Sequence, residues 1–316
     1  MKRVIIYLLG LCFALSSCEK IVEYNIDDDT LKPVLYAYLS DDKLTVNLFW
    51  SFSYVSDNDN PEINDASIVL YEGDSPLGTL ALVSDGMYEL TGISPTENTE
   101  YSLIVDVPGY DSSISAKTIM PSKAQANFSI SKDSVYYEFE DTTIYSYDLN
   151  LIIDDHAGAN NYYSYSADKI LFVDGIELND KVVIMEHASL LNVNRNKLMF
   201  VATEFGNGIY SILFHDRYID GARFEYVTKN LDVISLYDPE MQVEKIVDSA
   251  FVVPRFRTVN YDYYKFYCDA LGQSGASSST SEAYYVHSNV ENGFGIFAAY
   301  SEFSDTVVVH RNAILR

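Results

Sequence analysis

The stretch PVLYAYLSDDKLTVNLFW, from Pro33 to Trp50, decides the fold class of this chain. Apolar residues alternate with other residues on both sides of the short turn Asp41-Asp42-Lys43. An apolar period of two turns every second side chain toward one face, which is typical of a half-buried β-strand. The sequence therefore predicts two strands joined by a tight turn, Val34–Ser40 and Leu44–Trp50.

The same pattern continues downstream, where short apolar runs are separated by turn residues such as Glu72-Gly73-Asp74 and Pro108-Gly109. Five further strands are predicted at Ser67–Tyr71, Leu77–Val83, Met87–Thr91, Tyr101–Val107 and Ser113–Ile119. Seven short strands within about 90 residues is the spacing of an immunoglobulin-like sandwich. We expect such a β-sandwich over residues 33–121.

Residues 122–316 are also rich in strand patterns and include one helix. Asn260 is the expected N-cap of this helix, the run YDYYKFYCDAL follows it, and Gly272 is the expected stop. Strands are predicted at Val135–Glu140, Tyr145–Ile153, Tyr162–Ala167, Lys181–Ile184, Lys197–Glu204, Gly208–Phe214, Phe224–Thr228, Leu231–Leu236, Ala250–Arg257 and Val307–Arg311. The predicted class is all-β with minor α: an N-terminal immunoglobulin-like β-sandwich followed by a larger β-rich domain carrying one helix.

The first residues of the chain have the pattern of an export signal. Lys2 and Arg3 precede the apolar run Val4–Leu15, which is too short to span a bilayer as a helix. The small residues before Cys18 resemble a bacterial lipobox, and the alternative is an ordinary signal peptide with a Cys there by chance. We predict a lipoprotein signal peptide over residues 1–17, and a lipidated Cys18 with an acidic tether over residues 18–32.

Composition limits the partners. The chain has 46 Asp and Glu against 21 Lys and Arg, a formal net charge of −25. Nucleic-acid binding needs clustered basic residues, so we expect no nucleic-acid partner. Of the three Cys, only Cys268 would remain after export and lipidation, so no internal disulfide framework is expected.

The sequence holds no recognised catalytic motif, so we expect a protein that is not an enzyme and has no cofactor. A hydrolase with two carboxylates across a cleft is the alternative that sequence leaves open. The loop SDNDNPEIND supplies one weak calcium candidate, formed by Asp57, Asp59, Glu62 and Asp65. Carboxylate oxygens suit Ca²⁺, although Pro61 replaces an oxygen ligand and a solvated loop explains the same residues.

Several segments resemble an uncharacterised Bacteroidota outer-membrane lipoprotein family, known only as a domain of unknown function. They include Asn64–Tyr71, Asp216–Phe224 and above all Ser288–Phe297, which reads SNVENGFGIF. Asn292 departs from the family, which often has Gly there. The resemblance implies a TonB-dependent receptor as partner, because such receptors are often encoded beside this family. The tyrosine pairs and the last segment supply the interface candidates Tyr263, Tyr284, Asn289, Gly293 and Gly295.

The resulting hypothesis is a non-enzymatic, lipid-anchored outer-membrane protein on the cell surface, although the periplasmic leaflet is the alternative. It would act as an accessory or ligand-capture subunit of a TonB-dependent receptor. The second hypothesis is a structural or adhesive surface lipoprotein that binds host or neighbouring proteins. The sequence leaves open the ligand, the oligomeric state, and glycosylation at Asp-Ser/Thr-apolar triplets such as Asp133-Ser134-Val135.

Overall fold

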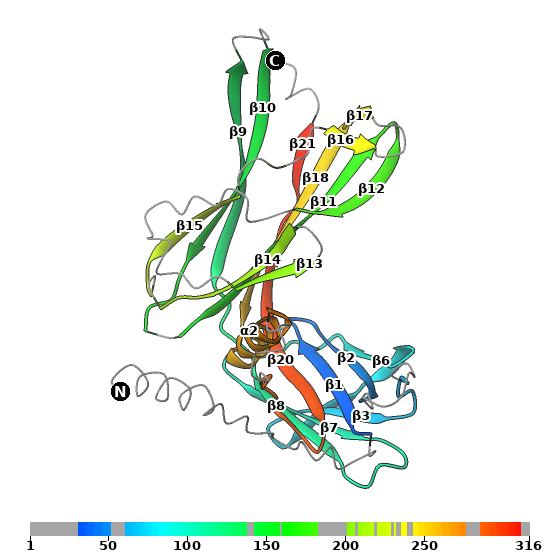
Figure 1. The fold of residues 1–316 in the computed structure, drawn as a ribbon. Helices are drawn as coiled ribbons and strands as arrows, with labels where there is room; N and C mark the ends of the chain where they lie inside the picture. The colour runs from blue at the N-terminus through cyan, green and yellow to red at the C-terminus, as the bar shows by residue number, and fades with distance from the viewer. Residues whose placement is uncertain are drawn as a thin grey trace, which may run out of the picture.

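The computed structural model describes residues 31–51, 61–137, 142–158, 160–182, 201–205, 208–217, 220–228, 231, 235–238, 243–275 and 285–310. Within them the protein is built mostly of strands with one helix, which confirms the expected all-β class with minor α. Figure 1 shows a lower and an upper group of strands, with helix α2 where the two groups meet.

An eleven-stranded sheet runs through both groups and organises the molecule. Its strand order is β13-β14-β11-β18-β20-β1-β2-β6-β5, with β12 also paired to β11 and β21 to β18. Its members are β1 (Pro33–Leu39), β2 (Lys43–Trp50), β5 (Ala81–Ser84), β6 (Met87–Thr91), β11 (Tyr162–Val173), β12 (Ile176–Lys181), β13 (Val201–Phe205), β14 (Gly208–His215), β18 (Ser249–Val259), β20 (Phe294–Ser304) and β21 (Val307–His310).

Three further sheets and the helix complete the described fold. A five-stranded sheet has the order β19-β8-β7-β3-β4, a three-stranded sheet the order β15-β10-β9, and β16 pairs with β17. Their bounds are β3 (Ser67–Glu72), β4 (Ser75–Thr79), β7 (Glu100–Asp106), β8 (Ile114–Ile119), β9 (Gln125–Tyr137), β10 (Thr142–Asp154), β15 (Arg223–Thr228), β16 (Ser235–Asp238), β17 (Val243–Ile246), β19 (Val290–Glu291) and α2 (Tyr261–Gly275).

The five-stranded sheet packs on the β1–β2 end of the long sheet and makes a two-layer sandwich. Alternate residues of β1 and β2 are buried between the layers, as the period of two predicts. Phe297 and Ala299 of β20 lie in the same core as Leu35 and Leu70. The predicted boundary after residue 121 falls between β8 and β9, and β20 brings the end of the chain back into this N-terminal sandwich.

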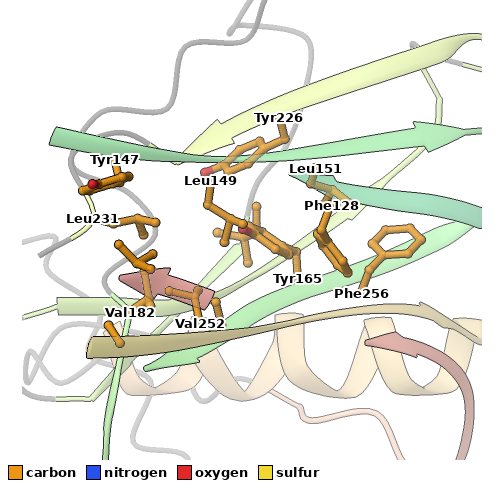
Figure 2. Packing of buried hydrophobic residues seen from close by; sticks show 14 of the residues in the cluster. Phe128, Tyr147, Leu149, Leu151, Tyr165, Val182, Tyr226, Leu231, Val252 and Phe256 are labelled. Carbon is orange, nitrogen blue, oxygen red and sulfur yellow. The ribbon is translucent and has the colours of Figure 1, made fainter. Parts of the chain in front are cut away.

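The three-stranded sheet covers the other end of the long sheet. Leu149 and Tyr226 reach the core from this layer, while Tyr165 and Phe256 reach it from the long sheet. Phe128 stacks on Tyr165 with ring centroids 6.3 Å apart, and both side chains are labelled in Figure 2. Aromatic side chains from both sheets thus fill the space between the two layers.

Some predicted strands differ from the observed structure. The expected strand Lys181–Ile184 is wrong, because β12 ends at Lys181 and the N–H of Val182 donates to the Ala167 carbonyl at 2.9 Å outside any strand; residues 183–184 are not described. The sequence predicts a single strand over Leu77–Val83, whereas the chain forms β4, changes sheet and then forms β5. Leu80 lies between them with its side chain buried, and its N–H donates to the Ile68 carbonyl at 2.9 Å. Burial of one apolar side chain between the layers therefore breaks the strand.

Helix α2 begins where the sequence predicts it and continues to Gly275, beyond the expected stop at Gly272. Asn260 is the N-cap: its Oδ1 accepts the N–H of Tyr263 at 3.0 Å, and its Nδ2 donates to Thr118 Oγ1 at 2.6 Å. The helix packs on the face of β20 that carries Ile296 and Ala298, opposite the face that enters the sandwich.

Candidate functional site

A pocket of about 360 Å³ lies where β11 begins, β14 ends and α2 starts. Three tyrosines line it, Tyr162, Tyr261 and Tyr264, and we call it the tyrosine pocket. The remaining lining side chains are polar or charged: Asn160, His215, Asp216, Arg217 and Lys265. Its volume lies near the lower end of the range for small-molecule sites, about 300–1,000 Å³.

Strand register and the helix cap position the pocket. Tyr162 pairs with His215 across β11 and β14 and with Val259 at the end of β18. Because α2 starts two residues after Val259, the Asn260 cap fixes the direction in which the first turn presents Tyr261. The three tyrosines, His215 and Lys265 thus lie on strand ends and a helix, which hold side chains more rigidly than free loops do, while Asn160, Asp216 and Arg217 lie just outside the strands.

The Tyr162 ring contacts the other two tyrosine rings of the pocket, and the three become more exposed from the core toward the solvent. Tyr264 is buried, and its ring centroid lies 4.8 Å from that of Tyr162. The Tyr261 ring lies 5.7 Å from the Tyr162 ring, and Tyr261 is 50% exposed. Neighbouring rings support Tyr261 from behind, so it offers aromatic area to a ligand at low entropic cost.

His215 is held in one orientation. Its Nδ1 accepts the backbone N–H of Arg217 at 3.1 Å, which assigns the proton of the neutral ring to Nε2. Burial lowers the pKa of His215 below its usual value of 6.5, so the ring is neutral near pH 7.

The charged lining residues differ in how they are held. Lys265 forms an ion pair with Asp269 one helical turn further along α2. Asp216 is only 2% exposed, accepts the N–H of Asn161 at 2.8 Å, and has a pKa raised by burial. Among the residues that the structure describes, none forms an ion pair with the Arg217 guanidinium.

Asp216 also belongs to a group of carboxylates that the sequence analysis did not predict. Asp155, Asp216 and Asp220 bring carboxylate oxygens within 4.8 Å of one another. Oxygens of this kind suit a hard cation such as Ca²⁺. Two backbone N–H groups also bind here, since Gly221 donates to Asp155 at 2.8 Å and Gly158 to Asp220 at 2.6 Å. The group therefore ties two loops together beneath the tyrosine pocket.

The candidates from the segment SNVENGFGIF have packing roles. Asn289 clamps β20, because its amide accepts the Phe297 N–H at 2.8 Å and donates to the Phe297 carbonyl at 2.7 Å. Gly295 has a φ of +107°, and a Cβ there would lie 2.0 Å from the Leu35 carbonyl oxygen. A Cβ at Gly293 would lie 2.9 Å from the Pro33 carbonyl oxygen.

The other sequence candidates are placed as follows. Tyr263 is 8% exposed and packs between α2 and β20, so its ring belongs to the core instead of an outer surface. Glu62 and Asp65 are exposed, while Asp57 and Asp59 lie outside the described residues, so the calcium loop stays a prediction. Cys18 and Tyr284 also lie outside them.

The backbone conformation at residue 292 explains why Asn can stand where the resembled family often has Gly. Asn292 has a φ of +59°, a conformation that Gly adopts freely and that Asn tolerates better than most residues. Its side chain donates to the Ser113 carbonyl at 2.9 Å, and its own carbonyl accepts the Tyr110 hydroxyl at 2.8 Å. Asn therefore keeps the turn before β20.

Two comparisons with known proteins bear on this chain. A family described as "Domain of unknown function (DUF4249)" matches residues 19–306. No curated protein matches the chain. Within the described residues, no helix is both long and apolar enough to cross a membrane.

Proposed function

The chain belongs to the DUF4249 family, whose function is unknown, and we propose that it is a non-enzymatic, lipid-anchored binding subunit of the outer membrane. In this proposal Cys18 carries the lipid and the acidic tether leads to the folded body. The tyrosine pocket captures a ligand and passes it to a TonB-dependent receptor.

The observation that carries the proposal is the tyrosine pocket itself. It is open, and it rests on strand ends and the start of a helix. Binding without chemistry is favoured because three titratable lining groups already have structural partners: His215 with the Arg217 N–H, Asp216 with Asn161, and Lys265 with Asp269. A general base needs a lone pair directed at its substrate. The hydrogen bonds of His215 and Asp216 and the ion pair of Lys265 instead hold these side chains to the rest of the fold.

Anchoring at Cys18 is compatible with the position of the first strand. Strand β1 begins at Pro33, and a chain of the length of residues 19–32 spans at most about 50 Å when fully extended. A lipid anchor of several acyl chains would also be effectively permanent, at about 0.8 kcal/mol per buried CH₂.

Purification from detergent-solubilised membranes tests the proposal. The tagged full-length protein should co-purify with a TonB-dependent receptor in a stoichiometric complex. A Cys18→Ser variant, which has no thiol for lipidation, should leave the outer membrane and lose the receptor. A lipidated protein that purifies alone from cells expressing such receptors would refute the receptor partnership.

A second candidate function, adhesion through strand pairing, is favoured by one specific observation. β4 and β5 each end the strand order of their sheets, and all four residues of β5 are exposed, including Val83 at 51%. Exposed apolar edge strands recruit further strands. Light scattering across a concentration series should then show self-association that Val83→Lys abolishes; a monomer at every concentration would exclude self-pairing.

A further inference from the structure

The tyrosine pocket combines an aromatic surface with basic side chains in a strongly acidic protein. The whole chain has 46 acidic against 21 basic residues, yet Arg217 and Lys265 both line this pocket. Asp216 is the acidic side chain of the lining, and it is buried against Asn161. Lys265 is paired with Asp269, so Arg217 is the lining cation that no described carboxylate pairs with.

Arg217 is the residue best placed to bind an anion. No described residue forms an ion pair with its guanidinium, and its backbone is fixed by the hydrogen bond to His215 Nδ1. A guanidinium presents donors in a planar fork that matches a carboxylate with two parallel hydrogen bonds. Lys265 adds a second positive charge, held by its ion pair with Asp269.

The aromatic side of the tyrosine pocket selects the shape of the ligand. The half-exposed Tyr261 and the Tyr162 ring behind it offer flat apolar area beside the two cations. Such a surface favours a ligand with a flat apolar face, either a sugar ring or an aromatic ring. Asn160 adds a polar side chain to the lining, which suits contact with hydroxyl groups.

Building on the proposed function, we infer that the tyrosine pocket binds a small carboxylate ligand with one flat face. The carboxylate pairs with Arg217, and the flat face lies on Tyr261. Two sources share this chemistry, acidic sugars such as uronic acids and small aromatic carboxylates. The ligand class follows from an aromatic wall and a guanidinium facing one space of about 360 Å³.

Calorimetry on the full-length lipidated protein in detergent tests this inference. The probes are digalacturonate, its neutral counterpart galactobiose, and 4-hydroxybenzoate. At least one of the two carboxylates should bind at a single site, and digalacturonate at least tenfold more tightly than galactobiose if sugars are the source. Binding should weaken as salt rises, because screening reduces the charge contribution.

Matched variants separate the pocket from general surface effects. Arg217→Gln should weaken carboxylate binding about tenfold, as expected for loss of one charge-assisted contact. Arg223→Gln, at an exposed arginine paired with Asp154, should leave it unchanged. Tyr261→Ala should also weaken binding, whereas Tyr285→Ala, at a tyrosine that is 81% exposed and outside the lining, should not.

The outcomes distinguish this inference from the proposed function. If neither carboxylate binds, or if Arg217→Gln binds as the wild type does, the ligand class is wrong. Co-purification with a receptor would then still support the binding-subunit proposal. Carboxylate binding that depends on Arg217, with no receptor in the purified material, would support the ligand class and count against the receptor.

Discussion

Adding one methyl group at Gly295 is expected to weaken the pairing of β20 with β1 and so to destabilise the fold. β20 pairs in parallel with β1, with Gly295 opposite Leu35. In Gly295→Ala the new Cβ would lie 2.0 Å from the Leu35 carbonyl oxygen, far inside van der Waals contact. Because that oxygen belongs to the backbone, no side-chain rotation relieves the overlap, so β20 must move away from β1.

Two effects set the magnitude. A φ of +107° strains any residue with a Cβ, by about 1–3 kcal/mol. Forcing extra volume into a packed region costs about 1–3 kcal/mol more. We therefore expect Gly295→Ala to lower the free energy of unfolding by about 2–6 kcal/mol.

Gly109→Ala is the matched control. Gly109 also has a positive φ, +82°, but a Cβ there would meet no atom within 4 Å. Only backbone strain remains, so the expected loss is about 1–2 kcal/mol. The difference between the two variants isolates the contact between β20 and β1.

Urea unfolding followed by tryptophan fluorescence measures both losses. The chain has one Trp, and Trp50 packs against the core of the N-terminal sandwich, so its signal reports on that sandwich. Gly295→Ala should shift the Trp50 transition to lower urea, although residue 295 lies far away in sequence. A Trp50 transition equal to that of Gly109→Ala would refute the conclusion that β20 is part of the N-terminal sandwich.

Three further outcomes follow from the contacts described above. Asn260→Ala removes the helix cap and leaves Thr118 without its 2.6 Å partner, so calorimetric scanning should show a loss of about 1–3 kcal/mol; an unchanged melting temperature would contradict this role. Burial lowers the folded pKa of His215, so the unfolded chain binds that proton more tightly, and wild-type stability should fall as pH drops from about 6.5 through the folded pKa. In pH-dependent urea titrations His215→Gln should lose that part of the slope, and an identical slope would show that other groups cause it. Asn289→Ala leaves both backbone groups of Phe297 without their side-chain partner, so unfolding should become easier by about 1–3 kcal/mol, with Asn179→Ala at an exposed position of β12 as the near-neutral control.

Local patterns in the sequence predicted part of the local structure, although no strand was predicted over β20. The strands on either side of Asp41-Asp42-Lys43 form β1 and β2 close to their predicted bounds. Asn260 was identified as the helix cap, and it is one. The predicted strand Leu77–Val83 was wrong as a single element, because burial of Leu80 between two sheets is a tertiary event that alternation does not encode.

The candidate site was much less predictable. Its residues come from separate stretches, around Asn160, around His215 and at Tyr261, and no fixed spacing connects them. Tyrosine content pointed to a role for some of the tyrosines, but not to which of them remain exposed. Tyr263 and Tyr261 are near neighbours in sequence, yet the helix turns one into the core and the other toward solvent.

The sequence by itself determined that this chain forms β-strands and one capped helix, because side-chain direction alternates along a strand and depends only on nearby residues. The tertiary structure alone decided that β20 lies beside β1 and that three distant segments enclose the tyrosine pocket. Those pairings join residues far apart along the chain, and they depend on whole faces fitting together. Gly295 is an example of what the sequence alone does not reveal, since it is one glycine among 15. Only the folded structure places the Leu35 carbonyl against it, which leaves no space for a side chain.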